Sequence, residues 1–194
     1  MGLAVMIAGL VLFLGVHTLT TQRDLRGGLI ASWGEGGYKI GYALVSLAGL
    51  VLIVWGFAHY RSDGMIELWT PPRVLKHLTV ALMLPSVILV VAAYIRGRIY
   101  VTIKHPMLSG VKLWAAAHLI ANGDLGGIIL FGSFLGWAVF DRISLKRRAD
   151  PGAPPIPVGG LSNDLIAVAV GVVAYLALVF AFHPVVIGIP VVGV

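Results

Sequence analysis

Histidine is the residue type with the most chemical potential in this chain, which contains six histidines and no cysteine. Two of them, His17 and His118, lie inside apolar segments, where an ionisable side chain is costly to place. A neutral imidazole is a good ligand for iron, copper and zinc. The lack of cysteine excludes disulfides, a thiolate haem ligand and cysteine-held iron–sulfur clusters.

His17 and His118 belong to predicted helices that run in opposite directions. Helical side chains tilt toward the N-terminus of their helix, so the two imidazoles lean toward a common height, and their Cα heights differ by only about 6 Å. That arrangement suits two axial ligands of one haem iron, whereas zinc needs three or four closely spaced ligands. The alternative is that each ring hydrogen-bonds a carbonyl or hydroxyl group of a neighbouring helix.

The remaining histidines are secondary candidates. His59 and His77 flank one connection between predicted helices, where interfacial anchoring is the favoured interpretation and a shared metal or haem is the alternative. His105 precedes a proline in a turn-like context. His183 also precedes a proline, at the end of the last predicted helix, and is interpreted as interfacial.

The elements that position these residues are predicted to be membrane-spanning helices. The chain has 194 residues, of which 59% are hydrophobic and 11% charged, a composition typical of integral membrane proteins. A bilayer core of about 30 Å requires about 20 helical residues. The sequence predicts an all-α bundle of about six transmembrane helices in one domain over residues 1–194: 2–20, 40–58, 78–95, 113–123, 125–140 and 165–182. The fourth and fifth are predicted to form a short hairpin at Asp124.

The net charge of +6 is explained by topology and requires no nucleic acid partner. Of the lysines and arginines, eleven fall in the loops after the first, third and fifth predicted helices and three on the other side. Both termini should therefore lie outside the cytoplasm. Basic residues on the predicted cytoplasmic side could pair with haem propionates: Arg23, Arg26, Lys104 and Lys112.

Residues 141–164 are predicted to form an extended cytoplasmic loop, basic at its start and then rich in proline and glycine. Ser162 or Asn163 is the predicted cap of the last helix. Glycines such as Gly49 and Gly126 allow either close helix packing, which is the favoured interpretation, or room for a flat ligand.

Three stretches together resemble the NnrU family of bacterial membrane proteins, which includes the 15-cis-zeta-carotene isomerase. They are "LFLGVHTLTTQRD" at 12–24, "FAHYRSDGMIELW" at 57–69 and "TIKHPMLSGVKLWAAAHLIANGD" at 102–124. The resemblance implies a location in the bacterial inner membrane, with both termini periplasmic by the charge bias, and a link to denitrification and nitric oxide metabolism.

The isomerase relatives bind haem b through two axial histidines and isomerise a central cis double bond when the iron is reduced. By motif, those ligands correspond to His17 and His118, and other family histidines correspond to His59 and His105. Ala116 and Ala117 stand where the isomerase has a cysteine near the ligand, so a thiol-linked redox switch cannot form here. The implied partners are membrane lipid and a lipophilic small-molecule substrate.

Two alternatives remain open. "HPMLSG" at 105–110 is similar to the His-Pro-x-x-x-Gly turn with which isoprenylcysteine carboxyl methyltransferases hold S-adenosylmethionine. Those enzymes also carry acidic residues further on, where this chain offers only Asp141-Arg142. The third hypothesis is a non-catalytic assembly factor for a membrane reductase.

Overall fold

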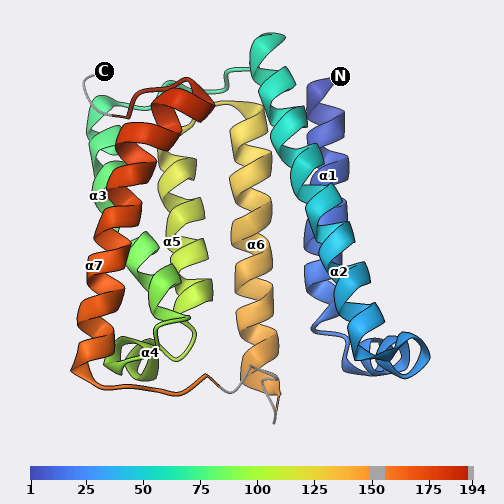
Figure 1. The fold of residues 1–194 in the computed structure, drawn as a ribbon. Helices are drawn as coiled ribbons and strands as arrows, with labels where there is room; N and C mark the ends of the chain where they lie inside the picture. The colour runs from blue at the N-terminus through green and yellow to red at the C-terminus, as the bar shows by residue number, and fades with distance from the viewer. Residues whose placement is uncertain (149–155, 192–194) are drawn as a thin grey trace. The chain divides into compact units, whose positions relative to one another are not determined.

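The computed structural model describes residues 1–148 and 156–191, and the chain in these ranges is almost entirely helical (Figure 1). The described residues form seven α-helices and one π-helical segment. Five helical segments are long and apolar enough to cross a membrane. The prediction of an all-α membrane bundle is therefore confirmed.

The helices fall into two compact units. Unit 1 comprises Met1–Thr70 and Asn122–Arg148, and unit 2 comprises Pro71–Ala121 and the described part of Ala149–Val194. The single domain over the whole chain stays a prediction. The same is true of the hairpin between the fourth and fifth predicted helices, because those helices belong to different units.

Unit 1 is built on the close approach of α1 (Gly2–Leu19) and α2 (Arg23–Ser62). A Cβ atom on Gly9 would lie 2.6 Å from the backbone nitrogen of Ile53, and one on Gly49 would lie 2.7 Å from that of Phe13. Gly2 and Gly56 meet in the same way. Small residues thus let the two backbones touch, which is a common basis of helix association in membranes.

The helix α2 has 40 residues because it joins two parts across a kink. Gly34 lies at the kink with φ 70° and ψ 164°, a conformation that other residues rarely adopt. Residues 23–33, the arm of α2, turn away from the long part of the helix (Figure 1). The prediction of 40–58 found the apolar part and missed the arm, whose arginines and glycines interrupt the hydrophobic run.

The third helix of unit 1, α6 (Leu125–Arg147), is capped by Asp124, whose carboxylate accepts a 2.7 Å hydrogen bond from Gly127 N. It extends well beyond residue 140, so the prediction that the loop begins at 141 was wrong. The half-buried Arg148 side chain pairs with Asp141 at 3.2 Å and bonds Ser144, which holds the added turns together. Basic residues in the last turn also interact favourably with the helix dipole.

Unit 2 contains α3 (Arg73–Ala92), α4 (Arg98–Ile103), α5 (Pro106–Ala121), α7 (Leu161–Ala177) and the π-helix Leu178–Ile187. Side-chain hydroxyl groups join its helices: Thr79 donates to the Ala117 carbonyl at 2.7 Å, and Ser86 donates to that of Gly110 at 2.8 Å. Such bonds satisfy polar groups that lipid cannot. The helix α3 is thereby fixed to α5 at two levels.

The predicted cap of the last helix was wrong. The N-cap of α7 is Gly160, without a side-chain cap hydrogen bond, and Asn163 instead donates to the Arg96 carbonyl at 2.8 Å. The neighbouring Asp164 accepts bonds from Arg98 N and Ile99 N, each at 3.0 Å. These side chains therefore connect α7 to the start of α4, whose free N–H groups attract a carboxylate.

Candidate functional site

His17 lies near the end of α1 among aromatic side chains of unit 1. Its Nδ1 donates to the Phe13 carbonyl oxygen one turn earlier, at 2.6 Å. The imidazole stacks on the Phe13 ring with centroids 4.2 Å apart, and the Tyr42 ring lies at 5.3 Å. The Trp137 ring of α6 is nearly perpendicular to the imidazole, with centroids 5.7 Å apart. Side chains of α1, α2 and α6 thus surround this imidazole.

His118 lies in α5 of unit 2 and has the same local hydrogen bond. Its Nδ1 donates to the Trp114 carbonyl oxygen at 2.9 Å, again one turn earlier. A carbonyl oxygen can only accept, so this bond places the proton on Nδ1 and the lone pair on Nε2. Both histidines are therefore in the tautomer in which Nε2 can coordinate a metal while Nδ1 is held by a carbonyl, as is usual for metal-ligating histidines.

His183 is a neighbour of His118 that the sequence analysis missed. The two rings are nearly parallel, at 23°, with centroids 6.5 Å apart. The π-helix turns His183 inward, and its Nδ1 bonds the Leu178 carbonyl five residues earlier at 2.9 Å. Helices α5 and α7 both pack on α3, which brings the two histidines together although they are far apart in the sequence. No local pattern could have predicted this pair.

The structure places the predicted ligands in separate units, with His17 in unit 1 and His118 in unit 2. Their pairing on one iron stays a prediction. The predicted propionate partners are likewise divided: Arg23 is the half-buried first residue of α2, and Lys112 is half-buried on α5.

The secondary histidines are more peripheral. His59 is exposed and contacts the Trp55 ring edge-on at 4.8 Å, and His77 is exposed on α3. His105 lies between α4 and α5, with its backbone N–H bonded to the Ile103 carbonyl at 2.8 Å. A shared site of His59 and His77 stays a prediction, since they belong to different units.

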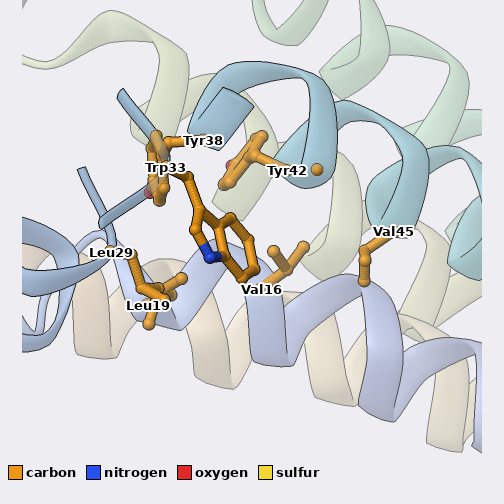
Figure 2. Close-up of a pocket in the computed structure, with 8 residues that line it drawn as sticks. Val16, Leu19, Leu29, Trp33, Tyr38, Tyr42 and Val45 are labelled. Atoms are coloured by element: carbon orange, nitrogen blue, oxygen red, sulfur yellow. The ribbon is translucent and has the colours of Figure 1, made fainter. Parts of the chain in front are cut away.

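A cavity of about 240 Å³ in unit 1 lies beside the surroundings of His17 (Figure 2). Tyr42 is common to both, since its ring contacts the imidazole and also lines the cavity. Nearly all of the lining is apolar: Val16, Leu19, Leu29, Trp33, Tyr38, Gly41, Tyr42 and Val45. This cavity could not be predicted from the apolar runs of the sequence, because the arm of α2 forms one of its walls.

Three buried polar atoms in unit 1 have no hydrogen-bond partner within the described residues: Tyr38 Oη, Ser46 Oγ and Trp137 Nε1. Buried polar groups without partners are uncommon in native proteins, and each calls for an explanation such as a water or a ligand. Two of the three belong to residues of the cavity or of the His17 surroundings.

The donor set fits haem better than a bare metal ion. Among the residues that the structure describes, no group of three or more His, Cys, Asp or Glu residues could hold a metal. Zinc sites generally need such a group, whereas haem needs one or two axial imidazoles and apolar walls. His17 and His118 each provide an imidazole with the required tautomer in a setting of apolar and aromatic side chains.

Comparison with known proteins identifies one family. The family model described as NnrU protein matches residues 5–191. No curated protein and no solved structure matches the chain. The family match covers nearly the whole sequence and includes all the helices described above except the first three residues of α1, and the chain therefore belongs to the NnrU family.

Proposed function

We propose that this protein is a haem b protein of the bacterial inner membrane that acts in redox or nitric oxide-linked chemistry. His17 and His118 would be the residues that hold the haem iron. The observation that supports the proposal is the hydrogen bond shared by both imidazoles, from Nδ1 to the carbonyl oxygen one turn earlier, at 2.6 Å and 2.9 Å. This bond fixes each ring and increases the basicity of its Nε2 atom.

The surrounding residues have distinct roles. Arg23 and Lys112 would bind the haem propionates, and the Tyr42 and Trp137 rings beside the His17 imidazole would keep water away from it. Bound haem would supply a one-electron redox centre, whose potential depends on axial ligands, hydrogen bonding and burial. Substrates of such a site are small or lipophilic molecules that partition into the membrane, and cis–trans isomerisation of a polyene is the variant suggested by the isomerase relatives.

Optical spectroscopy of the purified protein, with and without dithionite, tests this proposal. We expect a Soret band that shifts on reduction. The His17→Ala and His118→Ala variants should each lose or strongly weaken it, because each loses one axial ligand. The matched controls are His59→Ala and His77→Ala, which remove exposed imidazoles and should leave the band unchanged.

A folded, colourless protein from cells supplied with haem would contradict the proposal. Thermal unfolding of each variant separates loss of the ligand from loss of the fold. A stable membrane reductase partner in a pull-down, with partner activity unaffected by the histidine substitutions, would instead favour the assembly-factor hypothesis.

The "HPMLSG" motif has a structural explanation that does not involve methyl transfer. A Cβ atom on Gly110 would lie 2.8 Å from the Ser86 carbonyl oxygen, and the Ser86 hydroxyl donates to the Gly110 carbonyl. Pro106 begins α5 and is fully buried. The glycine and proline of the motif are thus used in the packing of α5 in unit 2.

A further inference from the structure

We propose that the cavity beneath the arm of α2 is a binding site for an anionic phospholipid, with one acyl chain in the cavity and the phosphate at Arg26. The proposal concerns unit 1 alone and does not depend on haem binding.

The lining of the cavity suits a hydrocarbon chain. Its walls come from α1, from the arm and from the long part of α2, and Figure 2 shows the Trp33 indole reaching from the arm toward Val16 of α1. Gly41 widens the space, since a Cβ atom there would contact only the Trp33 ring, at 3.4 Å. The apolar lining favours hydrocarbon, and the volume of about 240 Å³ can hold only part of an acyl chain.

A positive charge lies at one wall of the cavity. The Arg26 guanidinium is 5.5 Å from the centroid of the Tyr38 ring, and the same ring lines the cavity. The nearby carboxylate of Glu35 is paired with Lys39 at 2.8 Å. The buried Tyr38 hydroxyl, without a partner among the described residues, is a further polar group of this wall. An apolar slot beside a cation favours an amphiphile with an anionic head group.

The arm has the composition of a helix that lies in the membrane interface. It carries Arg23 and Arg26, and it exposes Leu25 by 56% and Trp33 by 60%. Helices with basic and large apolar residues bind at the depth of the head groups, where tryptophan is also favoured. The kink at Gly34 is what turns the arm out of the line of α2. The cavity beneath it is therefore placed where lipid phosphates and the upper parts of acyl chains meet.

Native mass spectrometry of the purified full-length protein, in detergent with equal amounts of phosphatidylglycerol and phosphatidylcholine, tests the proposal. We expect one retained lipid that depends on the cavity, with about a fivefold preference for phosphatidylglycerol, corresponding to one arginine near the phosphate. Arg26→Gln should abolish the preference, and Gly41→Leu should abolish this retained lipid by filling the cavity.

Two matched controls make the same kinds of substitution at other positions. Arg98→Gln removes an exposed arginine of unit 2, and Gly15→Leu adds the same side chain at a glycine of α1 with open space around it. Both should bind lipid like the unaltered protein. The proposal is overturned if Gly41→Leu retains as much lipid as the unaltered protein, or if the preference persists in Arg26→Gln. Displacement of the lipid by inorganic phosphate would also overturn it, because it would identify a free-phosphate site. Any loss of haem would be detected in the visible spectrum, separately from the masses of the protein–lipid complexes.

Discussion

At the scale of single residues, Asp164 shows how one carboxylate stabilises a helix other than its own. It is 7% exposed and satisfies the backbone N–H groups of Arg98 and Ile99 at the start of α4. A buried donor without a partner costs about 1–3 kcal/mol. We expect Asp164→Ala to lower the free energy of unfolding by at least that amount, measured by denaturant titration with tryptophan fluorescence.

Ser162→Ala is the control for this prediction, since Ser162 is an exposed residue two positions before Asp164. It should leave stability nearly unchanged. Equal stability of Asp164→Ala and the unaltered protein would show that the two N–H groups find other partners.

The histidines show which features of the candidate site can be predicted from the sequence. His17 and His118 could be selected because an ionisable side chain inside an apolar run is conspicuous. His183 could not be matched with His118, because their proximity depends on the packing of α5 and α7 on α3 and on a π-helical turn. The bond from His183 Nδ1 to the carbonyl oxygen five residues earlier depends on the same π-helical turn.

At the scale of elements, the contact of α1 with α2 depends on glycines that face each other. Gly9→Ala would place a methyl group within about 3 Å of α2 backbone atoms and force the helices apart. Overpacking of this kind costs about 1–3 kcal/mol. We expect a lower midpoint of thermal unfolding in detergent, followed by circular dichroism at a helical wavelength.

Gly15→Ala is the matched control on the same helix, because a Cβ atom there meets nothing within 4 Å among the described residues. Its added methyl group should leave stability unchanged or raise it by about 0.5–1 kcal/mol, the usual advantage of alanine over glycine in a helix. If both variants behave alike, close backbone contact is not what joins α1 to α2.

At the scale of the whole molecule, the distribution of basic residues predicts the orientation in the membrane. Eleven of the lysines and arginines lie on the side predicted to be cytoplasmic. The absence of natural cysteines allows single reporters to be introduced. We expect Ser62→Cys to react with an impermeant maleimide in intact cells, and Lys146→Cys to react only after the membrane is opened.

Both reporter positions are exposed, so accessibility within the protein does not limit either reaction. The reverse pattern of labelling would show that the chain is inserted the other way. It would also move the predicted propionate partners Arg23 and Lys112 to the periplasmic side.

Sequence patterns were sufficient to predict an all-α membrane bundle, the approximate place of its apolar helices and membership of the NnrU family. The bundle and its helices follow from local properties, since continuous apolar runs must form helices that satisfy their own backbone groups in lipid. Three further features depend on tertiary packing: the cavity beneath the arm of α2, the proximity of His118 and His183, and the hydrogen bonds from the start of α4 to the Asp164 carboxylate. Each of these depends on backbone groups and side chains from separate segments that come together only when the helices pack.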